Sequence, residues 1–211
     1  MPIVTALAPD PRQPGYRLVE VDRGRFASIP AESLKALPAP LAVGIELEGP
    51  TLARLQHLAD IEAAYRAAVR SLETRGRARH DLRRRLIQKQ HPPDAVDEAL
   101  ARLEGQGLLD DRRFAAEYAA RRAAGGRGSS RLVRDLLSQG VDRQLAQSAV
   151  TAALAQEGVD PRSMARLVAS RRAAQLAGLT PAVRRRRLLA YMARRGYPPV
   201  EVKELVEELC R

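Results

Sequence analysis

The sequence has few aromatic residues: its 211 residues include no tryptophan, two phenylalanines and five tyrosines. The core must therefore be aliphatic, built from leucine, valine and alanine, a mixture that favours helices over strands. Cys210 is the only cysteine, which excludes a disulfide within the chain. No apolar run approaches the roughly 18 residues of a membrane-spanning helix, and the proline-rich start does not resemble a signal peptide. We expect a soluble, cytoplasmic protein.

Acidic residues are also in short supply. There are 36 lysines and arginines against 25 aspartates and glutamates, so the formal net charge is +11. The first 50 residues carry a net charge of −1, and the remainder carries +12. A domain this basic attracts polyanions such as nucleic acid, an acidic protein surface or an anionic membrane. A GC-rich genome would explain why arginine outnumbers lysine, but it would not explain the excess of base over acid.

The residues that would support catalysis or metal binding do not form a pattern. The histidines His57, His80 and His91 include no pair at the helical spacing of a metal site. The glycine-rich segment 125–128 lacks the ending of a phosphate-binding loop, and we interpret it as a flexible connection between helices; a phosphate contact by Arg127 is the alternative. No base can be assigned to Cys210. We therefore predict a protein that is not an enzyme and that needs no metal and no cofactor.

Residues 1–50 are predicted to form an N-terminal arm and a small β-rich cap. Residues 1–14 are rich in proline and are expected to be disordered or extended. Two short alternating runs on either side of Asp22, Arg23 and Gly24 predict a β-hairpin. We expect a short helix over 31–37, between two prolines. The alternating residues of 41–47 predict a third strand.

From residue 51 onward the apolar residues recur with helical spacing and then repeat as a set. The second set follows the first by 50 residues, and the third follows the second by 56. The matching positions are Leu82, Leu86, Val96, Leu100 and Leu103; Leu132, Leu136, Ala146, Val150 and Ala153; and Leu188, Met192, Val202, Val206 and Leu209. Gly140 and Gly196 also occupy equivalent positions, with Gln90 in their place in the first set.

This repetition predicts a mainly α protein with three tandem three-helix repeats, at about 51–107, 108–157 and 158–211. Because each repeat would contact mainly its neighbours, we expect an elongated, curved array preceded by the β-rich segment. Ser129 or Ser130 and the pair Thr180 and Pro181 are predicted helix starts. Asp110 and Asp111 are expected to cap the helix that carries Phe114 and Tyr118, both of which we assign to the core.

Arginines cluster on or next to the middle helix of each predicted repeat, and two more lie at the C-terminal end of the middle helix of the third repeat. With Leu82 and Leu86 facing inward, Arg84 is expected to point outward, and Arg134 holds the equivalent position. We predict a basic surface that binds a partner or DNA, although a solvated face is the alternative. The glutamates at 201, 204, 207 and 208 are interpreted as a solvated face. The candidate binding residues are Arg79, Arg83, Arg84, Arg85, Arg127, Arg131, Arg134, Arg184, Arg186, Arg187, Arg194 and Arg195.

Several segments resemble the RecX family of recombinase regulators. The most specific is Gly107 to Gly128, with a Gly-hydrophobic-Asp-Asp start followed by Phe-Ala and arginines. Segments 64–86, 135–141 and 194–197 are similar to further family patterns in the same order, so the resemblance covers 52–211. There are two departures: Ala78 stands where the family often has serine, which removes a helix cap, and Gln139 replaces a common lysine.

The resemblance implies a specific function. Family members are repeats of a three-helix unit that bind the RecA filament on single-stranded DNA, and some also bind DNA directly. They inhibit recombinase, ATPase and co-protease activities in DNA recombination, repair and the SOS response. We therefore predict RecA filaments, and DNA in addition, as partners, with no membrane and no small-molecule substrate. The alternative from the residues alone is a DNA-binding transcription regulator built from tandem helix-turn-helix-like units.

Overall fold

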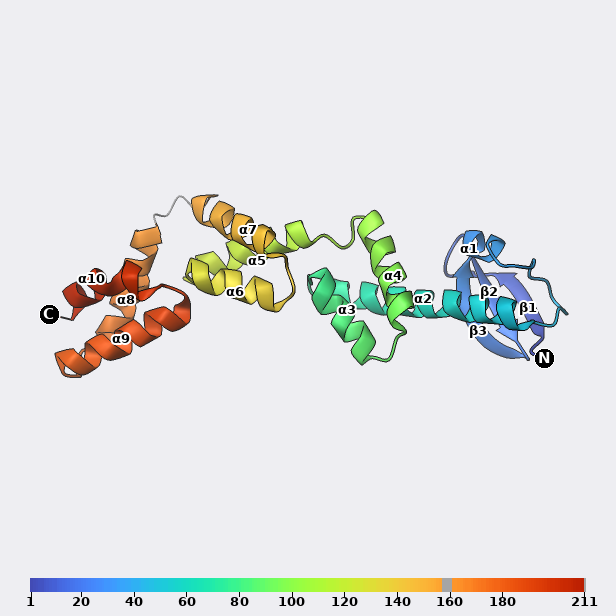
Figure 1. Cartoon of the computed structure of the whole chain (residues 1–211), viewed down its shortest axis with the longest axis horizontal. Coiled ribbons are helices and arrows are strands. Elements are labelled where there is room, and N and C mark those ends of the chain that lie inside the picture. Colours follow the sequence, from blue (N-terminus) through green and yellow to red (C-terminus); the bar gives the residue numbers. More distant parts are fainter. Residues whose placement is uncertain (157–160, 211) are drawn as a thin grey trace. The chain divides into compact units, whose positions relative to one another are not determined.

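A computed structural model describes residues 1–156 and 161–210. It is mainly helical, with a small antiparallel sheet at the N-terminus (Figure 1). The chain forms two compact units, the first made of Met1–Gly76 with Leu82–Leu109 and the second of Arg77–Asp81 with Asp110–Arg211. None of the helices in the described ranges is long and apolar enough to cross a bilayer.

The sheet contains β1 (Val4–Pro9), β2 (Tyr16–Val21) and β3 (Gly24–Pro30) in that order. Asp22 and Arg23 have φ values of 50° and 62° between β2 and β3, as a two-residue type I′ turn requires. The predicted hairpin is therefore confirmed. The short helix α1 (Ala31–Lys35) follows β3, also as predicted.

The prediction of a strand at 41–47 was wrong, and of the two alternatives for the N-terminal segment, disordered or extended, residues 4–9 are extended. The strand that completes the sheet beside the hairpin is β1. It pairs antiparallel with β2, so residues 4–9 belong to the sheet. Segment 41–47 forms only an isolated bridge between Ile3 and Glu46. Gly44 has a φ of +88°, which interrupts an extended run, and Val43 beside it is exposed. Alternation of apolar residues alone does not distinguish a strand from such a loop.

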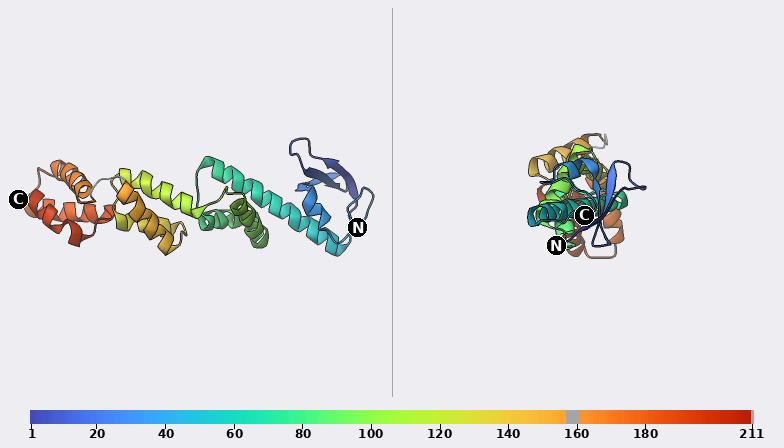
Figure 2. Two further views of the ribbon diagram at one scale, coloured as in Figure 1. Left: turned by 90° about the horizontal axis from the view of Figure 1, so that it is seen from above. Right: turned by 90° about the vertical axis from the view of Figure 1, so that its right-hand side faces the viewer.

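The sheet and the first three-helix repeat share one core in the first compact unit. The repeat consists of α2 (Gly49–Thr74), α3 (Arg79–Gln88) and α4 (Pro93–Gly105), with the 26-residue α2 clearest in Figure 2. Val4, Val19 and Ile29 of the strands pack with Leu55 of α2 in this core.

A polar network also joins the sheet to the helices. Arg102 of α4 forms an ion pair with buried Glu62 of α2 and donates a hydrogen bond to the Tyr16 hydroxyl of β2, and its guanidinium lies 4.0 Å from the centre of the Tyr65 ring. Arg66 donates to the Ser28 carbonyl of β3 at 2.9 Å. The sheet is therefore bound to the first repeat by both apolar and charged contacts.

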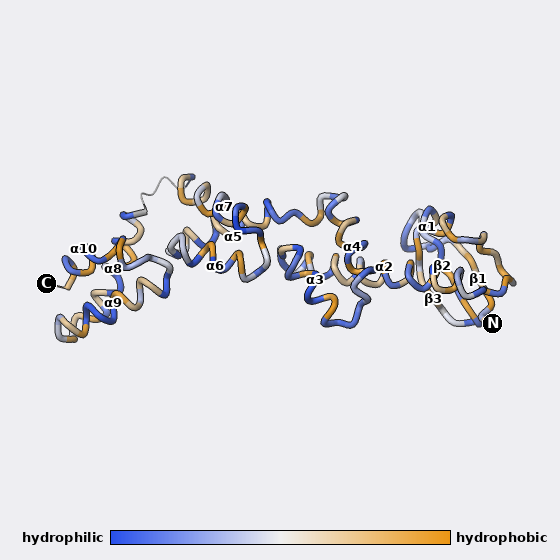
Figure 3. The backbone as a smooth tube through the Cα atoms, in the orientation of Figure 1, coloured by the Kyte–Doolittle hydropathy of each residue, from blue (hydrophilic) through white to orange (hydrophobic). Residues whose placement is uncertain are grey.

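The second compact unit contains the other two repeats. These are α5 (Asp111–Ala124), α6 (Ser129–Ser138) and α7 (Arg143–Gln156), then α8 (Pro161–Gln175), α9 (Pro181–Arg195) and α10 (Pro199–Leu209), and each repeat has its own apolar core. All the repeated apolar positions are buried except Leu209, which is half-buried beside buried Cys210; of the two aromatic residues assigned to the core, Phe114 is buried and Tyr118 is half-buried. Figure 3 shows orange and blue residues alternating along the helices, as expected where each helix buries one face.

The middle helices α3, α6 and α9 end in the same turn. Gln90, Gly140 and Gly196 have φ values of 66°, 81° and 93°, so all three lie in the left-handed region. The next residue in each turn donates its backbone N–H to a carbonyl five residues earlier, at 3.2, 3.1 and 3.0 Å. This is the Schellman motif, which satisfies a terminal carbonyl of each helix. The predicted equivalence of the three positions is confirmed.

The two glycines also lie where a side chain would not fit. A Cβ on Gly140 would lie 2.3 Å from the His80 Cβ, and a Cβ on Gly196 would lie 2.3 Å from the Arg131 Cβ. Each glycine therefore packs against the first turn of the middle helix of the preceding repeat. Gln90, which has no preceding repeat, is exposed.

The structure also accounts for the missing cap at Ala78. The Asp111 carboxylate accepts the Arg79 backbone N–H at 2.7 Å, so α5 supplies the cap for α3 that a serine would provide locally. Ala78 itself is buried in the core of the second unit. The predicted cap at Asp110 is confirmed, since its carboxylate accepts from the Arg112 and Arg113 backbone N–H groups at 2.8 and 3.0 Å.

The predicted starts of α6 and α9 are also confirmed, at Ser129 and Pro181. Neither helix has a side-chain hydrogen bond at its N-cap. The elongated, curved arrangement of the repeats remains a prediction. The division of the chain near residues 50, 107 and 157 remains a proposal.

Candidate partner-binding surface

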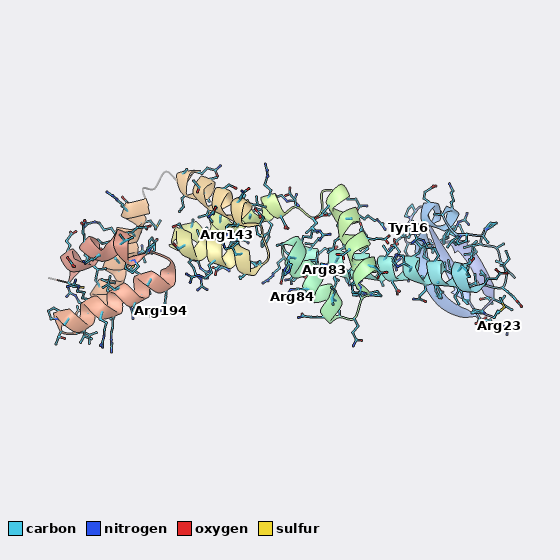
Figure 4. The ribbon with its side chains drawn as sticks, in the orientation of Figure 1. Tyr16, Arg23, Arg83, Arg84, Arg143 and Arg194 are labelled. Atoms are coloured by element: carbon cyan, nitrogen blue, oxygen red, sulfur yellow. The ribbon has the colours of Figure 1, made fainter. Side chains whose placement is uncertain are left out.

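Helix α3 carries the first group of predicted binding residues. Leu82 and Leu86 are buried and Arg84 is exposed, as the helical spacing predicts (Figure 4). Arg83 is half-exposed and donates two hydrogen bonds to Asp97 of α4, at 2.7 and 2.8 Å. These bonds and the charge of Asp97 raise the pKa of Arg83. Arg79 and Arg85 are half-buried and also take part in interactions within the protein.

Helix α6 and the segment before it carry one exposed arginine and two that form ion pairs locally. Arg134 is exposed, whereas Arg127 and Arg131 both pair with Asp135, the latter at 2.8 Å. The Asp135 side chain is only 13 % exposed and also accepts a hydrogen bond from the Tyr118 hydroxyl at 3.2 Å. Burial and the neighbouring carboxylate raise the pKa of Tyr118. Arg127 and Arg131 are therefore paired with Asp135, and their part in partner binding stays a prediction.

Helix α9 has exposed arginines at both ends. Arg186 and Arg187 lie in its first turns and Arg194 in its last turn (Figure 4), and none of these three forms an ion pair with any residue in 1–156 or 161–210. Arg184 instead donates to the Leu209 carbonyl at the end of α10. Arg195 donates to the Gly125 carbonyl at 3.0 Å, so its side chain joins the third repeat to the second.

The glycine-rich segment 125–128 is a packed joint and does not form an open loop. Its Gly126, Arg127 and Gly128 backbone N–H groups donate to carbonyls, including the Arg195 carbonyl, which Gly128 reaches at 2.8 Å. A Cβ on Gly128 would lie 2.4 Å from the Gly196 carbonyl oxygen. This geometry contradicts the predicted flexible connection and leaves these N–H groups unavailable to a phosphate.

His57, His80 and Cys210 make structural contacts. His57 of α2 lies 2.7 Å from a Glu98 oxygen and 3.4 Å from an Asp94 oxygen of α4, so it joins the two helices. His80 packs against Gly140. Cys210 is buried in the core of the third repeat. Within the part of the chain that the structure describes, no three potential ligands are grouped as a metal ion requires.

Sequence reasoning missed the acidic partners of these arginines. Asp135 follows Arg131 by four residues, a spacing at which opposite charges pair on a helix, so this contact could have been found. The pair between Arg83 and Asp97 joins two helices and has no comparable local signal. The exposed members of the predicted set are Arg84, which also takes part in an interaction within the protein, and Arg134, Arg186, Arg187 and Arg194.

Family models match the first two repeats. The first three-helix domain of RecX matches residues 64–103, and the second matches 110–150. "Regulatory protein RecX" of Mycobacterium ulcerans is 33 % identical over 146 residues, which cover 69 % of this chain and 83 % of that protein. The protein of the same name from Thermobifida fusca is 35 % identical over 155 residues, covering 71 % and 80 %.

Solved structures share the fold. A crystal structure of a regulatory protein RecX aligns with a TM-score of 0.72 over 99 % of this chain and 100 % of that chain, at 18 % identity. The structure of RecX from Lactobacillus salivarius aligns with a TM-score of 0.59 over 71 % and 96 %, also at 18 % identity. The first of these alignments includes the N-terminal sheet as well as the repeats.

Proposed function

Because the chain belongs to the RecX family of regulatory proteins, we propose that it binds the filament that RecA forms on single-stranded DNA and restrains its activity. The effect would be inhibition of the recombinase, ATPase and co-protease activities in DNA recombination, repair and the SOS response. The protein would act in the cytoplasm by binding, without catalysis. This proposal starts from what the family resemblance implies.

The observation that carries the proposal is the recurrence of an exposed arginine on each middle helix. Arg84, Arg134 and Arg187 each lie close to a buried leucine or methionine of the same helix and are themselves exposed. Arginine holds carboxylates and phosphates through a planar fork of donors, so these residues suit both acidic protein groups and a DNA backbone. A filament of protein on DNA offers both kinds of group along its length.

The test is the ATPase activity of RecA on single-stranded DNA, measured with and without the full chain. We expect the rate of ATP hydrolysis to fall as the protein approaches stoichiometric amounts relative to RecA. An unchanged rate at those amounts would contradict the proposal.

Binding of the same protein to duplex DNAs of different sequence distinguishes a transcription regulator from a filament regulator. A regulator that reads DNA would prefer one duplex sequence over others of equal length, because base contacts carry specificity. The filament proposal expects no such preference. Strong selection of one duplex sequence, with RecA activity unaffected, would favour the transcription regulator.

A further inference from the structure

The excess positive charge of the chain lies in the second compact unit. The first unit has 14 lysines and arginines against 13 aspartates and glutamates, whereas the second has 22 against 12. The most basic helix of the second unit is α9, which has six arginines and no acidic residue among its 15 residues. Interfaces with nucleic acid are much more positively charged than interfaces between proteins, so the composition of α9 favours a nucleic-acid ligand.

Helix α9 differs from the other two middle helices at one pair of positions. In α6 these positions hold Arg131 and Asp135, which form an ion pair at 2.8 Å. In α3 the same two positions again hold one acidic and one basic residue. In α9, 56 residues after the pair in α6, they hold Arg187 and Tyr191. The acid that pairs with an arginine in α6 is therefore replaced by an uncharged aromatic residue in α9.

Tyr191 brings arginines together without neutralising their charge. The guanidinium groups of Arg172 of α8 and Arg195 of α9 each lie 5.3 Å from the centre of its ring. The ring attracts cations but carries no charge itself, so both arginines keep their full positive charge. Arg187 lies four residues before Tyr191 and Arg194 three residues after it, so all three share one face of α9. One half-buried tyrosine is therefore flanked by four arginines.

Two of these four arginines are available to a ligand. Arg187 and Arg194 are exposed and form no ion pair with any residue that the structure describes (Arg194 is labelled in Figure 4). Their spacing of seven residues places them about 10 Å apart along the helix axis. One carboxylate can pair with only one of them, whereas a strand with a phosphate at every nucleotide can reach both. The spacing therefore also favours a polymeric anion.

We propose that this face of α9, formed by Arg187, Tyr191 and Arg194, binds the phosphate backbone of single-stranded nucleic acid. The inference rests on the proposed function, because it assigns the nucleic-acid contact of the filament to the third repeat. The contact is independent of base sequence, since the arginines meet phosphates. It does not require the first compact unit, in which basic and acidic side chains nearly balance.

The test is binding of a fluorescein-labelled oligothymidine to the full chain without RecA, measured by fluorescence anisotropy at several salt concentrations. We expect saturable binding that weakens as salt rises, and we expect the R187Q/R194Q double variant to bind about tenfold more weakly. Each phosphate contact on a single strand contributes about 0.7 to the slope of log binding constant against log salt concentration. Loss of two contacts should therefore make that slope shallower by about 1.4.

The matched control is the R54Q/R70Q double variant, which removes the same charge from exposed sites on α2 of the first unit. It should bind the oligothymidine nearly as the wild-type chain does. Circular dichroism should show the same helix content for all three proteins, because all four arginines are exposed.

The outcomes separate this inference from the proposed function. Absence of binding by the wild-type chain, or equal weakening by the control, would overturn the inference even if the protein inhibits the RecA ATPase. Weaker RecA inhibition by R187Q/R194Q with unchanged oligothymidine binding would also overturn it, because the two arginines would then contact protein. Oligothymidine binding that needs both arginines, without inhibition of RecA, would support the inference and contradict the proposed function.

Discussion

The residue after each middle helix has a left-handed backbone, but its side chain and its neighbours differ between the repeats. Gln90 carries a side chain at a φ of 66°, a conformation that glycine adopts without strain. Gly140 and Gly196 occupy the same conformation and additionally leave room for the preceding repeat. The backbone is therefore left-handed at this position in all three repeats, and packing excludes a side chain in two of them.

Opposite substitutions at two of these positions should have opposite effects on stability. We expect Gln90→Gly to raise the free energy of unfolding by up to about 1 kcal/mol, because it removes strain in an exposed turn. Gly140→Ala should lower it by more than about 1 kcal/mol, since the new Cβ meets His80. Urea denaturation of both variants measures the change. A stable Gly140→Ala protein would show that the first turn of α3 can move aside.

Two arginines of α6 should respond differently to charge reversal. Arg134→Glu should weaken inhibition of RecA ATPase without changing the urea midpoint, because the side chain is exposed. Arg131→Glu should lower the free energy of unfolding by about 1 kcal/mol, since it places a second carboxylate beside Asp135. Equal stability loss in both variants would show that Arg134 is structural.

At the scale of the element, the helix N-termini of the second repeat depend on ionised caps. Asp110 accepts backbone N–H groups at the start of α5, and Asp142 accepts those of Gln144 and Leu145, at 2.8 and 3.1 Å, at the start of α7. These backbone hydrogen bonds lower the pKa of both carboxyls from the ordinary 3.8. A lowered folded-state pKa stabilises the fold above the unfolded pKa, and this stabilisation is lost as the pH falls through the folded value.

Replacing both caps with asparagine tests this assignment. Asparagine is as good an N-cap as aspartate but does not titrate. We expect the D110N/D142N variant to lose less stability than the wild-type chain between pH 5 and pH 2, as measured by the thermal midpoint at each pH. Identical acid profiles for the two proteins would show that the lowered pKa values do not contribute to acid unfolding.

The elements were predictable to the extent that their signals are local. The helical spacing of the apolar residues and the capping residues identified the repeated helices, and the turn residues from Asp22 to Gly24 identified the hairpin. The strand at 4–9 was missed because its pairing with β2 is a tertiary contact, while 41–47 alternates as strongly and is interrupted by Gly44. The cap on α3 was also hidden, because Asp111 comes from another helix.

At the scale of the whole molecule, charge sets the conditions under which binding should be strong. With a net charge of +11, concentrated beyond residue 50, the protein should bind a polyanionic filament more weakly as salt rises. We expect the concentration for half-maximal ATPase inhibition to increase at least about tenfold between 50 and 200 mM salt. The RecA ATPase rate without the protein, at each salt concentration, is the control. Inhibition that does not change with salt would argue for apolar contacts.

Which arginines are available to a partner was only partly predictable from the sequence. The inward positions of Leu132 and Leu136 correctly place Arg134 outside. Arg184 and Arg195 are used within the protein because they contact carbonyls of α10 and of segment 125–128, which lie far from them in the sequence. Such neighbours follow from the way the third repeat packs, and no pattern in the sequence reports them.

The contacts of Gly140 and Gly196 with the preceding repeats set the order in which the repeats can pack during synthesis. Gly140 packs against His80 and Gly196 against Arg131, so the first turns of α3 and α6 are contacted by residues that the ribosome adds one repeat later. The core shared by the sheet and the first repeat contains no residue after Leu109, so it can form before Gly140 and Gly196 are synthesised. Synthesis from the N-terminus therefore adds each repeat onto one that is already made, and we expect a nascent chain paused between repeats to leave the first turn of its last middle helix without this contact.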